Sequence, residues 1–210
     1  MKNLSLSCTS IFYLLVGPVI YISNNPFVVS ATFIFLFIFS LLSLYALRSD
    51  LMADIRKVKL HPKLLLLFIV MLALAFVITY ISNSLLLPNN YTSQNQQVVN
   101  SSLLSPNLLI KTLSFLSSIL VAPIMESIIF QYGVQRNLAI KISTFTHSKI
   151  FTTLLSATIT FAIFFLFHSP SLSLNDLIYY SFLLFFCLFY GLSNDNLLLT
   201  IIFHMGWNLL

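Results

Sequence analysis

The chain of 210 residues is 59% hydrophobic and 7% charged, with ten Lys or Arg, five Asp or Glu and a formal net charge of +5 at pH 7. Its apolar runs recur at lengths near the ~20 residues that cross a hydrocarbon core, and the ~10-residue alternating segments of a β-barrel are absent. With two Cys it has neither a disulfide framework nor a cysteine zinc site. The composition therefore indicates a polytopic α-helical membrane protein.

Seven apolar segments, taken in chain order, predict an all-α polytopic transmembrane helical bundle of about seven spans. The first segment is short and is interrupted by Pro18 and by Asn24, Asn25 and Pro26. It could instead be a re-entrant or interfacial segment, or pair with the second as a hairpin, so six spans are also possible. The predicted spans are residues 11–22, 27–47, 64–87, 108–134, 150–168, 177–192 and 197–210.

Basic residues gather in two of the predicted loops, residues 48–63 and 136–149, whereas residues 88–107 carry no charge at all. The positive-inside rule places both basic loops in the cytoplasm and the uncharged loop outside, which makes the N-terminus of this cell-membrane protein cytoplasmic. The net charge then needs no nucleic-acid partner, and we expect anionic membrane lipids as neighbours of these loops.

The polar groups that stand out against the apolar background all lie in the last four spans. We therefore expect residues 1–107 to form a scaffold of transmembrane helices and residues 108–210 to form the functional core. Neither a linker between folded units nor an internal repeat is visible, which predicts one integral membrane unit.

Glu126 is the first of these polar groups. A carboxylate near the bilayer centre costs ~2.5–3.5 kcal/mol, so its presence needs an explanation. Pro123 bends or restarts the helix just before it and frees backbone groups that need polar surroundings. Helical spacing puts Glu126 and Phe130 on one face, and Ser127 and Gln131 on another. A protonated Glu bound to a neighbouring helix explains this pattern as well as a functional carboxylate does.

Two histidines and an amide follow. His168 closes an aromatic helix just before Ser169 and Pro170, where an interfacial cap is the simpler role. His204 and Asn208 are four residues apart and share a helix face, so Asn208 could be a structural partner of His204. Taken together with Glu126, these groups can activate water and stabilise an oxyanion, as hydrolysis or transfer at an amide bond requires.

The spacing sets one condition on this grouping. At ~1.5 Å rise per residue, Glu126 and His204 both lie part-way up from the cytoplasmic side, whereas His168 falls near the external end of a span that starts at residue 150. We therefore expect this span either to begin several residues later or to tilt strongly, because His168 cannot otherwise reach the site.

The order of these residues resembles the CPBP family, the CAAX-protease and bacteriocin-processing membrane proteins also called Abi, over residues 108–210. The family pattern is Glu-Glu-x-x-x-Arg, then Phe-x-x-x-His, then His-x-x-x-Asn. The resemblance implies that Glu126 and His168 activate water and that His204 and Asn208 hold the oxyanion. No cofactor is implied, and zinc held by two His and one Glu ranks lower. The matching residues are Glu126, Phe164, His168, His204 and Asn208.

The chain departs from the family pattern at two positions. Ser127 stands in place of the second Glu, and Gln131 stands in place of the Arg. Arg136 lies five residues further on and is not a substitute by spacing. These departures argue against standard prenyl-protein proteolysis but leave amide-bond chemistry open.

Three functions follow as expectations. The resemblance implies first a membrane enzyme of the glutamate-peptidase type, acting on an amide or acyl bond of a membrane-bound or lipid-modified polypeptide. A staphylococcal member of the family is the membrane component of a two-protein lipoprotein N-acylation system, which implies acyl transfer to a lipoprotein amine with a second protein as partner. The third is a non-catalytic scaffold, immunity or signalling protein in which the same polar residues fix helix register.

Overall fold

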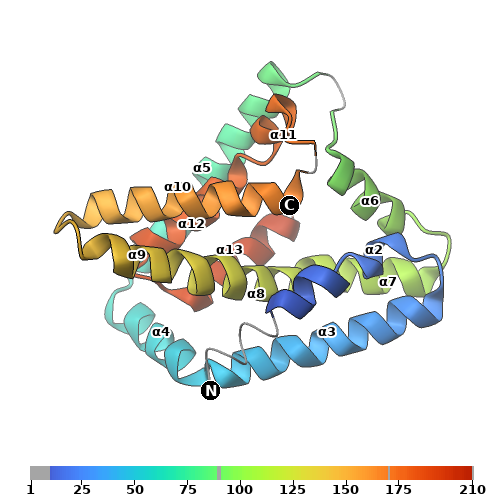
Figure 1. Ribbon diagram of the computed structural model, residues 1–210, viewed down its shortest axis with the longest axis horizontal. Helices are drawn as coiled ribbons and strands as arrows, with labels where there is room; N and C mark the ends of the chain where they lie inside the picture. Colours follow the sequence, from blue (N-terminus) through green and yellow to red (C-terminus); the bar gives the residue numbers. More distant parts are fainter. Residues whose placement is uncertain (1–9, 89–90, 170, 210) are drawn as a thin grey trace.

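The structure is a computed structural model that describes residues 10–88, 91–169 and 171–209. All regular structure within these ranges is helical, as predicted (Figure 1). Four helical segments are long and apolar enough to cross a membrane. They are α3 (Pro26–Ala46), α5 (Lys63–Leu86), the continuous segment Leu108–Ser143 and α10 (Lys149–His168).

Three shorter apolar helices complete the set. They are Ser10–Ile22, which ends in α2 (Val19–Ile22), α12 (Phe182–Leu192) and α13 (Leu197–Leu209). Each of the seven predicted spans therefore corresponds to an apolar helix, four of them of membrane-spanning length. The chain is an all-α membrane protein.

Local sequence accounts for where the long helices begin. Asn25 precedes α3, where its side chain accepts a hydrogen bond from the Phe27 N–H and Pro26 occupies the first helical position. Ser148 precedes α10 and accepts from the N–H of Phe151 in the same way. These caps satisfy backbone donors that would otherwise be unpaired at a helix start.

The segment Leu108–Ser143 alternates between α-helix and π-helix. Its parts are α7 (Leu108–Leu116), η1 (Ser117–Val121), α8 (Ala122–Glu126), η2 (Ser127–Gln135) and α9 (Arg136–Ser143). In η1 the Ala122 N–H donates to the carbonyl of Ser117, five residues back. Pro123 lies at the start of α8, directly after this π-helical stretch. The wider turn thus accommodates a proline inside a continuous helix.

The helices depart from the predicted spans and loops at four places. The span predicted to end at residue 134 continues to Ser143, so Arg136 and Lys141 lie on a helix and not in a loop. Two predicted loops contain helices, α4 (Arg48–Leu60) and α6 (Gln94–Leu103). The span predicted over 177–192 is broken, because α11 (Leu174–Tyr179) ends before α12 begins. The buried Asp176 holds α11 to the segment after α10 through hydrogen bonds from Ser169 and Ser171.

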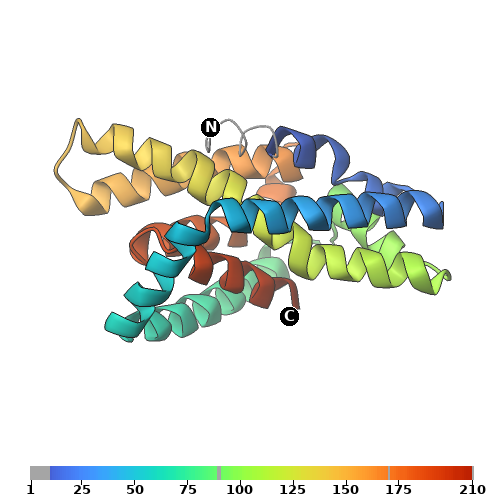
Figure 2. The ribbon, with the colours of Figure 1, turned by 90° about the horizontal axis from the view of Figure 1, so that it is seen from below.

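The two basic regions lie at one end of the molecule. Figure 1 and Figure 2 both place α4 and the turn between α9 and α10 at the left, and the link between α6 and α7 at the right. This arrangement agrees with the predicted separation of basic and uncharged loops. The cytoplasmic position of the basic end remains a prediction.

Aromatic side chains fill the core between α10, α12 and α13. Phe164, Phe186, Phe189 and Phe203 are each fully buried. Phe189 and Phe203 stack with ring centroids 4.8 Å apart, and Phe164 stacks on Phe130 of η2 at 4.1 Å. This packing fixes the helices that carry the predicted site residues.

Candidate active site

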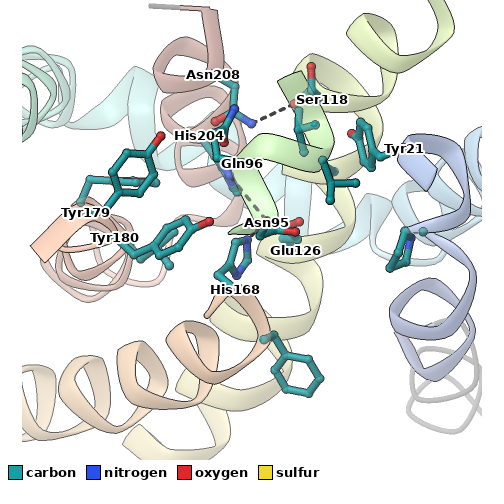
Figure 3. A pocket seen from close by; sticks show the side chains of 18 of the residues that line it. Tyr21, Asn95, Gln96, Ser118, Glu126, His168, Tyr179, Tyr180, His204 and Asn208 are labelled. Carbon is teal, nitrogen blue, oxygen red and sulfur yellow. Dashed lines mark hydrogen bonds and ion pairs between the residues drawn. The ribbon is translucent and has the colours of Figure 1, made fainter. Parts of the chain in front are cut away.

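A cavity of about 710 Å³ lies between the N-terminal helical segment, α6 and the helices of the C-terminal half (Figure 3). Its wall includes all four predicted site residues, Glu126, His168, His204 and Asn208. Phe130 shares this wall with Glu126, whereas Ser127 and Gln131 are not part of it. The prediction that these pairs lie on different helix faces is therefore confirmed.

Glu126 lies at the end of α8 with its two carboxyl oxygens in different surroundings. Its Oε2 is 3.8 Å from Nε2 of His168 and 3.7 Å from Nε2 of His204. Its Oε1 accepts a hydrogen bond from the Tyr13 hydroxyl at 3.1 Å. The Glu126 side chain is 14% exposed, so this carboxyl group is shielded but open to the cavity.

His168 reaches Glu126 by a route that the sequence did not predict. The helix α10 begins at Lys149, so the first of the two expected alternatives, a later start, is wrong, and the second, a strong tilt, stays a prediction. The preceding helix instead continues to Ser143, and α9 and α10 run antiparallel from that turn (Figure 1). Because the stretch from Glu126 to Ser143 is nearly as long as α10, the end of α10 returns to the level of Glu126.

The backbone of α10 sets the tautomer of His168. Nδ1 of its ring lies 3.0 Å from the carbonyl oxygen of Phe164, one turn earlier. A carbonyl oxygen only accepts hydrogen bonds, so Nδ1 carries the proton and, in the neutral ring, Nε2 is an acceptor. This acceptor faces Glu126, while the ring packs edge-on against Phe164 and Tyr180.

His204 is held in α13 among aromatic rings. Its ring centroid is 4.3 Å from that of Phe186 and 6.3 Å from that of Phe164. Its side chain is 4% exposed, and its Nδ1 has no hydrogen-bond partner among the residues that the structure describes. Glu126 is thus the polar group that Nε2 faces.

Asn208 does not pair with His204, which overturns that structural role. Its Nδ2 donates to the carbonyl oxygen of Ser118 in η1 at 2.8 Å, the contact drawn as a dashed line in Figure 3. In η1 a backbone N–H donates to the carbonyl oxygen five residues earlier. The donor to the Ser118 carbonyl would therefore be the N–H of Pro123, which proline lacks. Asn208 therefore satisfies a carbonyl that the proline leaves free.

The residues that replace the family Glu and Arg lie outside the cavity. Ser127 and Gln131 are fully buried, and Gln131 Nε2 lies 3.7 Å from Cys187 Sγ on α12. Arg136 lies over the ring of Tyr132 and 3.9 Å from Asp50 on α4. Arg136 therefore does not take the place of the missing arginine, as its spacing predicted.

Two residues of the N-terminal half that sequence reasoning missed support the site. Tyr13 donates to Glu126, and the buried Asp54 accepts from the N–H groups of Leu197 at 2.8 Å and Leu198 at 3.3 Å. Asp54 thereby caps the helix that carries His204 and Asn208. An acid one helical turn after Asp50 in an otherwise basic stretch was the signal for Asp54. Tyr13 had no comparable signal.

Most polar side chains in the cavity wall carry no formal charge. Among the described residues that line it, none is Lys or Arg, and Glu126 is its one acid. The other polar groups are hydroxyls, imidazoles and carboxamides, the last including Asn83, Asn95 and Gln96. No group of three or more His, Cys, Asp or Glu within the described ranges is arranged to hold a metal ion.

Comparison with known proteins gives one finding. No curated protein and no solved structure matches the chain. A family model described as type II CAAX prenyl endopeptidase Rce1-like matches residues 108–210, the stretch over which the motifs resemble the CPBP family. Residues 108–210 therefore belong to the Rce1-like group of the CPBP family.

Proposed function

We propose that the protein is a membrane enzyme that acts on an amide or acyl bond of a membrane-bound or lipid-modified polypeptide. Glu126 is the general base, His168 is its partner, and His204 with Asn208 stabilises the oxyanion. The observation that carries the proposal is the position of Glu126 Oε2, within 3.8 Å of two imidazole Nε2 atoms at the wall of a cavity.

The separation of Glu126 and His168 supports activation of water. A distance of 3.8 Å is too long for a direct hydrogen bond and short enough for one water to bridge the two atoms. Both atoms are acceptors, because Nδ1 of His168 carries its proton toward Phe164. A bridging water donates both hydrogens and keeps its lone pairs for attack on a carbonyl carbon.

His204 and Asn208 supply donors in the wall of the same cavity. The Nε2–H tautomer of His204 points its proton into the cavity beside Glu126. The amide of Asn208 has two N–H groups, and Ser118 accepts one of them. The second remains for the negatively charged oxygen of a tetrahedral intermediate.

The hydrolytic reaction balances with these groups alone. The water oxygen bonds to the carbonyl carbon while its proton passes to Glu126. The intermediate then collapses, the C–N bond breaks, and Glu126 returns the proton to the departing amine. Each group acts in a role that its position in the cavity wall allows.

The lack of Lys and Arg among the described lining residues of the cavity favours a second candidate, acyl transfer to an amine. A substrate carboxylate entering this cavity finds no Lys or Arg among the described lining residues, so its desolvation is uncompensated. An amine instead meets the carboxylate of Glu126. Its nitrogen bonds to the carbonyl carbon of an acyl ester, its proton passes to Glu126, and the alcohol leaves with that proton. A second protein then supplies or delivers the acyl ester or the lipoprotein.

Mass spectrometry of N-terminal peptides and lipopeptides from host membranes tests the proposal. We compare membranes carrying the wild type, Glu126→Gln, Asp195→Asn or no copy of the protein. Asp195 is an exposed acid in the turn before α13, and its substitution is the matched acid-to-amide control. Expression of each variant is checked so that loss of protein is not mistaken for loss of activity.

Each outcome assigns a different function. An uncleaved longer peptide in both the null and the Glu126→Gln membranes indicates a protease. Lipoprotein N-termini that lack an acyl group in both indicate acyl transfer. If Glu126→Gln matches the wild type while the null differs, the enzyme proposal is wrong and the polar residues act as a scaffold.

A further inference from the structure

Tyr13 brings a hydroxyl group into the site from outside the stretch that matches the family. It lies on the segment Ser10–Ile22, is 9% exposed and lines the cavity beside Glu126. Its hydroxyl donates to Oε1 of Glu126 at 3.1 Å. The family match begins at residue 108, so nothing in the matched stretch accounts for this contact.

Because of this contact, the two carboxyl oxygens of Glu126 have different partners. Oε1 is held by Tyr13, and Oε2 is the atom near Nε2 of His168 and His204. The terminal torsion of a Glu side chain is broad, so the carboxyl group has no strong preference of its own for this orientation. A donor fixed on one oxygen therefore decides which oxygen faces the histidines.

The two residues that replace the family Glu and Arg do not supply such a donor. Ser127 and Gln131 are buried outside the cavity, and the amide of Gln131 is directed to Cys187. Among the described residues, Tyr13 is the one side chain that donates a hydrogen bond to Glu126. Support for the carboxyl group thus comes from the N-terminal half of the chain.

Gly17 lets the Tyr13 ring take its position. A Cβ atom at Gly17 would lie 2.8 Å from the backbone carbonyl oxygen of Tyr13 and 3.3 Å from Cε2 of its ring. Both distances are tighter than ordinary van der Waals contact, so any larger residue would displace the Tyr13 backbone together with its ring. The ring packs directly on the glycine, one turn further along the segment.

We propose that Tyr13 is a positioning residue for Glu126, holding Oε1 so that Oε2 faces His168 and His204. This inference rests on the proposed function of Glu126 as the base. It makes the N-terminal segment part of the active site and not only a scaffold.

Infrared difference spectroscopy of the purified full-length protein tests the contact without a substrate. The difference between wild type and Glu126→Gln identifies the carboxyl stretching band of Glu126. We expect Tyr13→Phe to shift this band, because the ring stays and only the hydroxyl donor is lost. Tyr80→Phe, which removes an exposed hydroxyl on α5 outside the cavity, is expected to leave the band in place.

The mass-spectrometric comparison then tests the role. Loss of a hydrogen bond to a charged group predicts that Tyr13→Phe reduces product formation on the order of tenfold to a hundredfold. Tyr80→Phe, which removes an exposed hydroxyl on α5, is expected to retain wild-type activity. If Tyr13→Phe does not fold, Gly17→Ala provides a second test, because displacement of the Tyr13 backbone and ring should move the hydroxyl and shift the same band.

The outcomes separate this inference from the proposed function. An unchanged Glu126 band in Tyr13→Phe overturns the inference. A shifted band with wild-type product levels in Tyr13→Phe, while Glu126→Gln is inactive, also overturns it. A shifted band with an active Glu126→Gln protein means that the proposed function has failed, and Tyr13 is then only a structural contact.

Discussion

Asn208 on α13 is bound to the carbonyl oxygen of Ser118 on η1 at 2.8 Å, and the cause is a third residue, Pro123. Proline has no backbone N–H to donate to the carbonyl five residues earlier, so the Ser118 carbonyl needs a donor from another helix. Asn208 provides it. A backbone irregularity in one helix thus fixes the position of a predicted oxyanion residue on another.

This relationship predicts a specific coupling between positions 123 and 208. Asn208→Leu should lower the free energy of unfolding by about 0.6–1.7 kcal/mol, as for other hydrogen bonds between membrane helices. In a Pro123→Ala background the helix regains an N–H, and the cost of Asn208→Leu should shrink. A double-mutant cycle of SDS-induced unfolding measures the coupling. Additive effects of the two substitutions would contradict this account.

Asp54 provides the second prediction, because it caps α13 from the N-terminal half of the chain. Asp54→Ala should lower the free energy of unfolding by about 0.5–2 kcal/mol. Asp54→Asn keeps an acceptor oxygen and should lose less. Trp207, the one Trp of the chain, lies on α13, so its fluorescence during thermal unfolding reports on this helix.

The control for the Asp54 substitutions is Arg56→Gln. Arg56 is an exposed residue on α4, the helix that carries Asp54, and its substitution should leave the unfolding midpoint unchanged. Because α13 also carries His204 and Asn208, Asp54→Ala should reduce activity along with stability. Equal stability of Asp54→Ala and the wild type would show that the N-terminus of α13 needs no cap from α4.

Patterns in the sequence predicted the helical class and the residues that meet in the cavity. Apolar length alone identifies the membrane helices, and an isolated acid in such a helix is costly enough to mark Glu126. The spacing of His204 and Asn208 was informative because helical periodicity fixes which side chains share a face. These inferences depend on local spacing, which a single sequence contains.

Contacts over long distances in the chain could not be predicted in this way. The helix continues to Ser143 and packs against α10, whereas the charges of Arg136 and Lys141 on their own indicated a loop. Tyr13 lies on the first apolar segment, for which the sequence left open whether it crosses the membrane. Its hydroxyl binds Glu126, which is 113 positions away in the chain. The division of one integral unit into a scaffold of residues 1–107 and a functional core of residues 108–210 remains a prediction, and residues of both parts line the cavity.

Asp176 provides a prediction of pH dependence at the segment that follows His168. Desolvation raises the pKa of its carboxyl group, but hydrogen bonds from neighbouring hydroxyls outweigh this and bring the pKa below its ordinary value of 3.8. The carboxylate accepts from Ser169 at 2.8 Å and from Tyr91 at 2.7 Å, and also from Ser171. These bonds favour the ionised form, which the folded state therefore stabilises.

The sign of the effect follows from this lowered pKa. The stabilisation is fully present above the unfolded pKa, near 3.8, and is lost as the pH falls through the lower folded value. Asp176→Asn should thus destabilise the protein at neutral pH and differ progressively less from the wild type below about pH 4. Unfolding midpoints at pH 7 and pH 3 measure this. A difference that is independent of pH would contradict it.

Restoring the family residues at positions 127 and 131 should not restore a family activity. Gln131 is fully buried against α12, so Gln131→Arg places an unpaired charge there and should cost about 3–5 kcal/mol of unfolding free energy. Adding Ser127→Glu should recover part of this loss, because residues four apart on a helix can pair. Neither variant should gain activity, since neither position lines the cavity. SDS-induced unfolding and the lipopeptide comparison measure both effects, with the exposed Gln97→Arg on α6 as the matched control. A stable Gln131→Arg protein would mean that this position reaches water or a carboxylate.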